Sequence, residues 1–472
     1  MRKITLKSSL LLCFLFISKN THAGVQEDFQ KIIKKHHFAE STLGIYVEDD
    51  GKKVVDINAG KLMVPASLTK VVTGGAILTK LPLNIKFVTE LWSKAPIEGE
   101  SLKGALCIKG GGDPSFVSEK MWYLVNEFTR SGVKTIEGDI LVDASRFDSE
   151  LFDAGRDSVR VDRAYDAPVS PISFNWNSVN VYIRPGLKEN DPARVFLDPI
   201  NDYLELENRT KTVAKSGVKT IDVSRVKMGL RDKIIVTGSI SQNAGEAVVY
   251  KSISNPTLWT GHHLKQFLLQ RGIIVKGNIK EGECESDSKV LAKVDSKYLN
   301  EMTSDMLKFS NNFVAEMLAK NLAAEEITKG KGASMKDGIE SIKTYLDKLG
   351  LNRKDYVLEN VSGLTRDNRF TAKQLALVLT SIKNDFLIFP EFLSGLPIAG
   401  VDGTMKNRLK TQDFSLVRAK TGYLDGVVGL AGYVGRKDNS PLIFVFMFNG
   451  GFDQGLAARP LFDALISELF KL

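Results

Sequence analysis

Cysteine and histidine are scarce in this chain, with three and five residues among 472. Neither type forms a Cys-x-x-Cys pair or a cluster with metal-ligand spacing, so the sequence indicates no zinc site and no disulfide-rich scaffold. Beyond the first 23 residues the cysteines are Cys107 and Cys284. In an exported protein they could pair, and otherwise they would remain two buried thiols. The sequence leaves both possibilities open.

The signature of a Ser-His-Asp hydrolase is also missing. No Gly-x-Ser-x-Gly motif occurs. His22 falls within the export signal predicted below, and the other histidines lie in surroundings typical of surfaces and helix ends: His36, His37, His262 and His263. The stretch "GGGDP" at 110–114 lacks the Lys-Ser/Thr of a phosphate-binding loop, which favours a turn. We therefore expect no cofactor and no metal.

A membrane-spanning run is absent as well. The apolar stretch from Leu10 to Ile17 falls short of the roughly 20 residues that a span requires, which argues against a membrane anchor. It follows a basic start and precedes Thr21-His22-Ala23, a pattern typical of a cleaved export signal. We predict a signal over residues 1–23. The mature chain would lie in the periplasm, or on the cell-wall side of the membrane, with at most peripheral membrane contact.

Strong charge of one sign is also lacking. The formal charge is +8, and four of the basic residues belong to the predicted signal, which leaves +4. Basic runs with interleaved aromatic residues do not occur, so we expect no nucleic-acid partner.

The two ends of the chain carry the pattern of one α/β domain. "LGIYVEDDGKKVVDI" has two β-rich runs around Asp49-Asp50-Gly51, which predicts a hairpin. "GVVGLAGYVG" and "PLIFVFMFNG" predict two further strands, and "ARPLFDALISELFKL" predicts a closing helix. With the helical patterns between them, these segments favour an antiparallel sheet flanked by helices. We assign residues 24–85 and 296–472 to this domain.

The middle of the chain predicts a large nested insertion. Strand and helix patterns alternate first, a strand-rich stretch follows, and a helix with a strand then returns. We predict an inserted α/β domain of residues 86–165 and 250–295, interrupted by a β-rich domain of residues 166–249.

Ser67 and Lys70 stand three residues apart in "VPASLTKVVTGGAIL", at the start of an apolar stretch. Pro65 is typical of a first helical turn, and on one helix the two side chains would share a face. A serine hydroxyl needs a base to act as a nucleophile, and a desolvated lysine can be that base. The spacing alone is weak evidence, because it recurs at Ser131, Ser216, Ser224 and Ser286.

Two further motifs contain groups that suit a peptide-binding cleft. Ser310 and Asn312, in "KFSNNFVAE", offer a hydroxyl for proton relay and an amide for a substrate amide, with helix capping as the alternative. Lys420-Thr421-Gly422, in "RAKTGYLDG", opens a strand whose edge can pair with an extended peptide. Its lysine and threonine can hold a carboxylate, and its glycine permits close approach.

The order and setting of the three motifs resemble those of β-lactamases and penicillin-binding proteins. The gap of 243 residues between Ser67 and Ser310 exceeds that of compact β-lactamases. It is similar to that of the D-alanyl-D-alanine carboxypeptidase/endopeptidase family, the S13 serine peptidases of the penicillin-binding protein 4 type. Nearly the whole mature chain resembles this family, as in "KGGGDPSF", "YDAPVSPISFNWNSV" and "LPIAGVDGTMKNR". One departure is Asn311, where the motif has aspartate.

This resemblance implies a β-lactamase/transpeptidase-like fold for the α/β domain. It also implies hydrolysis of peptidoglycan peptides that end in D-Ala-D-Ala, and of cross-links that contain D-Ala. Ser67 would attack the D-alanyl carbonyl with Lys70 as general base, and Ser310, assisted by Lys420, would pass the proton to the leaving amine. β-Lactam antibiotics would be covalent inhibitors.

The resemblance assigns substrate binding to the second and third motifs. Asn312 would bind the substrate amide, and Lys420 and Thr421 would hold the terminal carboxylate beside Gly422. The backbone N–H groups of Ser67 and Tyr423 would form the oxyanion hole.

The same family reads the charged side chain of the penultimate diamino acid. The matching positions are Asp143, in "LVDASRF", for an ammonium group and Arg366, in "SGLTR", for a carboxylate. A strand-end cap for Asp143 and a structural ion pair for Arg366 are the alternatives. Asp425 follows the third motif and could touch the same patch.

Two other functions remain in competition. A β-lactamase shares the acylation steps but needs a second base for rapid deacylation, and the sequence assigns none. A wall-binding protein without catalysis would lack one of the motif residues, yet all are present. The sequence leaves open the oligomeric state, the role of the inserted domains, the type of cell wall and the balance between carboxypeptidase and endopeptidase activity.

Overall fold

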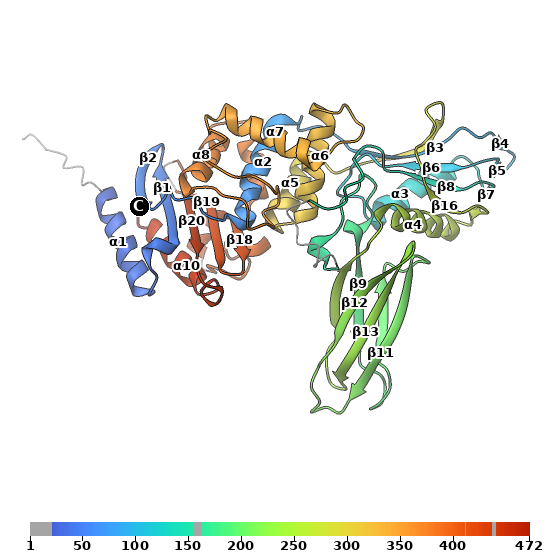
Figure 1. The fold of residues 1–472 in the computed structure, drawn as a ribbon, viewed down its shortest axis with the longest axis horizontal. Coiled ribbons are helices and arrows are strands. Elements are labelled where there is room, and N and C mark those ends of the chain that lie inside the picture. The colour runs from blue at the N-terminus through green and yellow to red at the C-terminus, as the bar shows by residue number, and fades with distance from the viewer. Residues whose placement is uncertain (1–20, 154–161, 411, 437–439) are drawn as a thin grey trace, which may run out of the picture.

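The computed structural model describes residues 21–153, 162–410, 412–436 and 440–472 (Figure 1). Residues 1–20 of the predicted export signal lie outside these ranges, and its last three residues begin helix α1 (Thr21–Lys35). Within the described ranges, no helix has both the length and the hydropathy needed to cross a bilayer.

A five-stranded antiparallel sheet joins the two ends of the chain, as predicted from the sequence. Its order is β18-β19-β20-β1-β2. Tyr46 on β1 lies opposite Asp56 on β2 and Val445 on β20, which confirms the predicted hairpin and places β1 inside the sheet. The strands are β1 (Leu43–Asp49), β2 (Lys52–Ile57), β18 (Val417–Leu424), β19 (Val427–Val434) and β20 (Leu442–Asn449).

Both faces of this sheet are buried, which explains the unbroken apolar run of β20. Phe444 and Phe446 belong to the core beneath α1 and α10 (Ala458–Leu469). Val445 and Met447 point to the opposite face and join the core of the helical layer. Because successive strand side chains alternate between faces, a strand covered on both sides needs apolar residues at every position.

The helical layer surrounds α2 (Thr69–Lys80), whose residues from Thr69 to Leu78 are all buried. Helices α5, α6, α7 and α8 contact α2 directly, so they bury its polar residues Thr69, Lys70 and Thr73 together with its apolar ones (Figure 1). Their bounds, with α9, are α5 (Leu299–Lys308), α6 (Asn312–Glu326), α7 (Met335–Lys348), α8 (Ala372–Lys383) and α9 (Phe389–Gly395).

The first part of the insertion contains two sheets and two helices. The sheet orders are β16-β8-β6-β3-β17 and β15-β7-β5-β4. The elements are β3 (Val88–Ser93), β4 (Ile97–Glu98), β5 (Ser101–Leu102), β6 (Leu106–Lys109), α3 (Ser118–Thr129), β7 (Thr135–Ile136), β8 (Ile140–Asp143), α4 (Pro256–Gln270), β15 (Ile274–Val275), β16 (Ile279–Glu281) and β17 (Lys289–Asp295).

The second part of the insertion consists of two three-stranded sheets, β10-β9-β14 and β11-β13-β12, which extend away from the rest of the molecule (Figure 1). The strands are β9 (Ser178–Arg184), β10 (Arg194–Asp198), β11 (Leu204–Val213), β12 (Asp222–Met228), β13 (Arg231–Ser241) and β14 (Ala247–Ser252).

The division of the insertion into two domains stays a prediction. Strand β14 crosses the predicted boundary at residue 249, because its pairing with β9 continues to Ser252. Both parts also contribute to one continuous hydrophobic core, in which Ile108 and Val142 join Val181 and Ile234.

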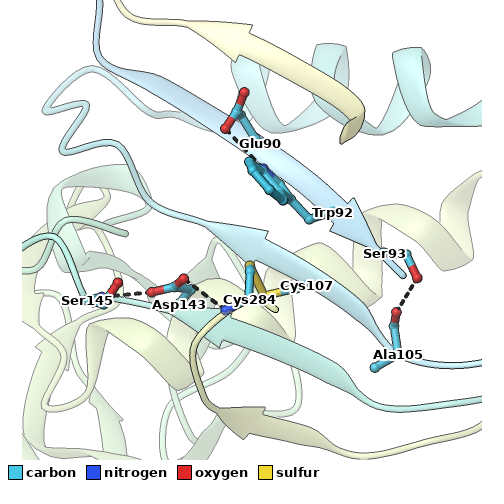
Figure 2. Close-up of a disulfide and its surroundings, with 8 residues drawn as sticks. All are labelled: Glu90, Trp92, Ser93, Ala105, Cys107, Asp143, Ser145 and Cys284. Atoms are coloured by element: carbon cyan, nitrogen blue, oxygen red, sulfur yellow. Dashed lines mark hydrogen bonds between the residues drawn. A yellow bond between two sulfur atoms is a disulfide. The ribbon is translucent and has the colours of Figure 1, made fainter. Parts of the chain in front are cut away.

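Cys107 on β6 and Cys284, after β16, form a disulfide (Figure 2). The bond closes a loop of 177 residues, which contains the whole β-rich part of the insertion. The sequence left open whether these two cysteines pair or remain free thiols, and in the structure they pair.

We expect removal of this disulfide to destabilise the insertion, because the bond restricts the unfolded chain. A Cys107→Ser/Cys284→Ser double variant should lose about 2–5 kcal/mol in the free energy of unfolding. Urea denaturation of the oxidised wild type and the variant measures this loss, and the reduced wild type is the control. Equal midpoints for all three would contradict the expectation.

Candidate active site

Ser67 lies in a 3₁₀ turn, η2 (Ala66–Leu68), that leads directly into α2. This corrects the predicted single helix opened by Pro65. Ala66 has a positive φ of 48°, which is uncommon for alanine and persists only where its surroundings impose it. Here the Ala66 carbonyl accepts a hydrogen bond from Oγ1 of Thr69 at 2.9 Å. The turn leaves Ser67 half-buried and within reach of Lys70.

The Lys70 side chain is fully buried, and its amine lies among three acceptors. Nζ donates to Oγ of Ser67 at 3.2 Å, to Oδ1 of Asn312 at 2.7 Å and to the carbonyl oxygen of Ser362 at 2.5 Å. Asn312 and Ser362 are 242 and 292 residues away from Lys70 in sequence. One amine therefore joins the first and second predicted motifs.

Ser310 lies in the short connection between α5 and α6, where the chain turns with a φ of 56°. Its neighbour Asn311 is the N-cap of α6, and Oδ1 accepts from the Val314 N–H at 3.2 Å. Aspartate and asparagine cap helices about equally well, so asparagine in place of the motif's aspartate preserves this turn. The segment from Ser310 to Asn312 thus contains both the cap of α6 and the second motif.

Lys420 on β18 is fully buried and completes the connection to the third motif. Its Nζ donates to Oγ of Ser310 at 2.8 Å and to the carbonyl oxygen of Thr421 at 2.7 Å. Burial, together with the positive charge of nearby Lys70, holds the pKa of the Lys420 amine well below its usual range. Two buried amines and two hydroxyls are therefore brought together.

Gly422 lets β18 approach the Ser67 turn closely. A Cβ at this position would lie 2.9 Å from the carbonyl oxygen of Pro65, so any larger residue would push the strand away. Beside it, Oγ1 of Thr421 donates to Oγ1 of Thr404 at 2.7 Å. The Tyr423 ring is partly exposed, 5.0 Å from the Arg459 guanidinium.

Arg366 and Asp425 lie together at the end of β18, where Nη2 of Arg366 donates to the Asp425 carbonyl oxygen at 2.5 Å. Arg366 lies four residues after Ser362, whose carbonyl oxygen receives Lys70. The contact uses the backbone of Asp425 and therefore differs from the side-chain ion pair considered as the alternative.

Asp143 lies at the end of β8 and has hydrogen-bond partners of its own. Its two carboxylate oxygens accept the N–H groups of Ser145 at 2.8 Å and Cys284 at 2.9 Å, beside the disulfide (Figure 2). Arg146, shortly after it, donates to Asn321. Asn321 lies nine residues after Asn312 on α6, which is about 13 Å along the helix. Its carboxylate caps the end of its strand, and substrate binding by Asp143 stays a prediction.

Sequence reasoning missed Glu316. This residue is fully buried on α6, one turn after Asn312. Its Oε1 accepts from the Ser362 hydroxyl at 3.0 Å and so helps to hold the segment whose carbonyl receives Lys70. The available signal was an acidic residue inside the otherwise apolar stretch "FVAEMLA". Ser362 and Thr404 were also missed, although both lie in stretches that resemble the family.

The site can perform nucleophilic catalysis with the side chains present. Lys70 is placed to remove the proton of Ser67, and the Lys420–Ser310 pair can move a second proton within the same group. Among the residues that the structure describes, no group of three or more histidine, cysteine or acidic side chains could hold a metal ion.

The chain is similar to known proteins over nearly its whole length. Residues 25–467 match the model of the D-Ala-D-Ala carboxypeptidase 3 (S13) family. A D-alanyl-D-alanine carboxypeptidase from Actinomadura sp. (strain R39) is 30% identical over 462 residues, which cover 94% of this chain and 84% of the relative.

The fold matches that of a solved penicillin-binding protein. Penicillin-binding protein 4 (dacB) from Haemophilus influenzae has a TM-score of 0.82 at 24% identity, over 94% of this chain and 99% of that one. Its complex with a β-lactam has a TM-score of 0.76 at 23% identity over the same shares of the two chains.

Proposed function

The chain belongs to the S13 family of D-Ala-D-Ala carboxypeptidases, and on that premise we propose that its acyl-enzyme forms on Ser67. The observation that carries the assignment is the Lys70 amine, which contacts both the Ser67 hydroxyl and the Asn312 amide oxygen. The substrates are peptidoglycan peptides that end in D-Ala-D-Ala. β-Lactams, one of which occupies the related structure, would acylate the same serine.

In the acylation step, Oγ of Ser67 attacks the carbonyl carbon of the penultimate D-Ala while Lys70 takes the hydroxyl proton. The C–N bond to the terminal D-Ala then breaks, and its amine receives a proton through Ser310 and Lys420. The N–H groups of Ser67 and Tyr423 would stabilise the oxyanion, each donor being worth about 2.7–4 kcal/mol in comparable sites. Water subsequently hydrolyses the ester and regenerates Ser67.

Lys420 and Thr421 would hold the terminal carboxylate of the substrate. A carboxylate beside a desolvated amine stabilises the charged form of the amine. Binding of the substrate carboxylate therefore raises the low pKa of Lys420. The complex then binds more protons than the free enzyme. The affinity for the peptide should therefore rise as the pH falls from the higher pKa of Lys420 in the complex to its lowered pKa in the free enzyme.

We expect this coupling to appear as uptake of a fraction of a proton when a D-Ala-D-Ala peptide binds the inactive Ser67→Ala variant. Calorimetry in two buffers of different ionisation enthalpy measures the uptake. The matched control is the same peptide with a C-terminal amide, which lacks the carboxylate and should show none. Equal uptake for both peptides would exclude Lys420 as the carboxylate-binding group.

Arg366, with Asp425 beside it, would recognise the charged side chain of the diamino acid before D-Ala-D-Ala. Arg366→Ala should raise KM about 10-fold or more for peptides with a carboxylate on that side chain, because a charge-assisted hydrogen bond is lost. Peptides with an uncharged side chain should be unaffected. An equal increase for both peptides would indicate a structural role.

Export to the periplasm or the cell-wall side of the membrane fits this function. The Cys107–Cys284 disulfide supports an oxidising compartment, where such bonds persist. The predicted signal over residues 1–23 would supply the export route, and detection of Gly24 as the N-terminus of the secreted protein would test it.

The same site would also cut D-Ala-containing cross-links as an endopeptidase. Digestion of purified peptidoglycan fragments, with products identified by mass, tests both activities at once. Loss of one alanine residue marks carboxypeptidase action, and conversion of cross-linked dimers into monomers marks endopeptidase action. Absence of both products would overturn the proposed function.

A further inference from the structure

A groove of about 900 Å³ begins at the second motif and continues between the insertion and the α/β domain of residues 24–85 and 296–472, here called the catalytic domain. Ser310 and Asn312 line its near end, and α3, η4 (Asn175–Asn177), β9 and β14 supply its far wall. Neither Lys420 nor Thr421 lines it. The groove therefore meets the active site at the second motif and does not include the proposed carboxylate contacts.

This placement identifies which end of the substrate meets the groove. With the terminal carboxylate at Lys420 and the substrate amide at Asn312, the peptide's N-terminal side points toward Asn312. The carbonyl oxygen of Tyr165, from the insertion, already contacts Nδ2 of Asn312 at 3.3 Å and forms the start of the groove wall. In peptidoglycan the N-terminus of the stem peptide is attached to the glycan strand.

Exposed aromatic side chains line this groove. Tyr165, Trp176, Tyr250 and Phe309 are each at least 46% exposed, although they lie in a hollow rather than on a convex surface. The amide of Asn180 lies among them, whereas both ends of the Asn175 amide are bonded to Ser118. Flat rings beside amide groups suit a sugar, whose C–H face stacks on a ring while its hydroxyl and acetamido groups form hydrogen bonds.

Trp176 is held in an unfavourable backbone conformation. Asn175, Trp176 and Asn177 have φ values of 49°, 53° and 52°, and a positive φ is a clear outlier for a residue as bulky as tryptophan. Hydrogen bonds fix the flanking residues: Asn175 bonds to Ser118 at 3.0 Å, and Asn177 donates to the Pro168 carbonyl at 2.8 Å. Strain that the surroundings maintain is typical of binding sites.

The charges on the wall disfavour an anionic ligand, because its two lysines are paired and Glu119 and Asp198 add carboxylates. Its two lysines are paired, Lys297 with Asp305 at 2.8 Å and Lys120 with Asp113 at 3.0 Å. A second stem peptide would bring carboxylates that need cationic partners, whereas N-acetylated sugars carry no charge.

We propose that this groove binds the N-acetylated glycan strand to which the substrate peptide is attached. The proposal rests on the peptidase function proposed above. It gives the insertion a role, which is to recognise the sugar while the catalytic domain holds the peptide.

The test compares kcat/KM for a free pentapeptide ending in D-Ala-D-Ala with that for the same peptide on a disaccharide of N-acetylglucosamine and N-acetylmuramic acid. The wild type should prefer the disaccharide substrate by about tenfold, the usual effect of one aromatic anchor. Trp176→Ala and Tyr250→Ala should each lower this ratio toward one. Both side chains are exposed, so neither change removes core packing.

Trp122→Ala is the matched control, because Trp122 on α3 is 48% exposed, close to the 46% of Trp176, and lies outside the groove. It should leave both rate constants at the wild-type values. A chitin-type tetramer of N-acetylglucosamine should also bind the wild type saturably, with a change in tryptophan fluorescence that Trp176→Ala abolishes.

The outcomes separate the two proposals. If the wild type cleaves neither substrate, the peptidase function fails. If it cleaves both equally and the tetramer does not bind, the glycan proposal is overturned and the peptidase function stands. A preference for a sugar-free cross-linked peptide dimer, without a preference for the disaccharide, would assign the groove to a second peptide and overturn the proposal as well.

Discussion

Replacement of Ser67 by alanine should abolish acylation while the protein stays folded. The Ser67 hydroxyl is the nucleophile that Lys70 contacts, and loss of the nucleophile in a serine hydrolase lowers kcat by on the order of 10⁶-fold. Ser67 is half-buried and its Oγ only accepts from Lys70 in the hydrogen bonds described, so stability should change little. Labelling with fluorescent penicillin, followed on a denaturing gel, measures the acylation directly.

The matched control for this variant is Ser216→Ala. Ser216 has the same Ser-x-x-Lys spacing, with Lys219, but it lies exposed in the β-rich part of the insertion. It should label like the wild type. Stoichiometric labelling of Ser67→Ala would show that another residue is acylated and would remove Ser67 from the mechanism.

Replacement of Lys70 by methionine should have the second largest effect. Methionine keeps an unbranched chain in the buried site and removes the amine. Without the base, the rate of acylation should fall about 10²–10⁴-fold. The Asn312 amide oxygen and the Ser362 carbonyl would each lose a donor, which costs about 1–3 kcal/mol in the free energy of unfolding. Stopped-flow acylation and urea denaturation measure the two effects separately.

Lys320→Met distinguishes loss of the base from loss of a buried charge. Lys320 on α6 is only 1% exposed, and its Nζ donates to Oδ1 of Asp148 at 2.6 Å and to the Glu150 carbonyl at 2.7 Å. Its removal leaves a carboxylate without its partner and should cost about 3–5 kcal/mol. Acylation should nevertheless remain fast. If both variants lost acylation in proportion to stability, Lys70 would be structural and not a base.

The helix α6 illustrates how far local sequence carries the prediction. "SNNFVAEMLAK" predicts a capped helix, and Asn311 does cap it. The same letters also contain Ser310 and Asn312, whose roles cannot be separated from capping by spacing alone, since serine and asparagine are common in both. Only the contacts of Asn312 with Lys70, and of Ser310 with Lys420, distinguish the two interpretations.

Asp143 shows the opposite case. The motif "LVDASRF" resembles the family and places an acid at a strand end, yet the structure gives both carboxylate oxygens to backbone N–H groups. One donor, Cys284, is 141 residues away in sequence. No periodicity in the sequence could have identified that partner.

The sequence by itself determined the order of the three motifs, the hairpin and the buried strand of the main sheet, and the family to which the chain belongs. These features depend on residue type and on short spacings, which local backbone geometry converts directly into turns, strands and helices. The tertiary structure alone decided that Lys70 reaches Asn312 and Ser362, that Cys107 pairs with Cys284, and that a groove lined with aromatic residues continues from the active site. Each of these depends on distances between segments far apart in the chain, and such distances are set by packing of the whole core.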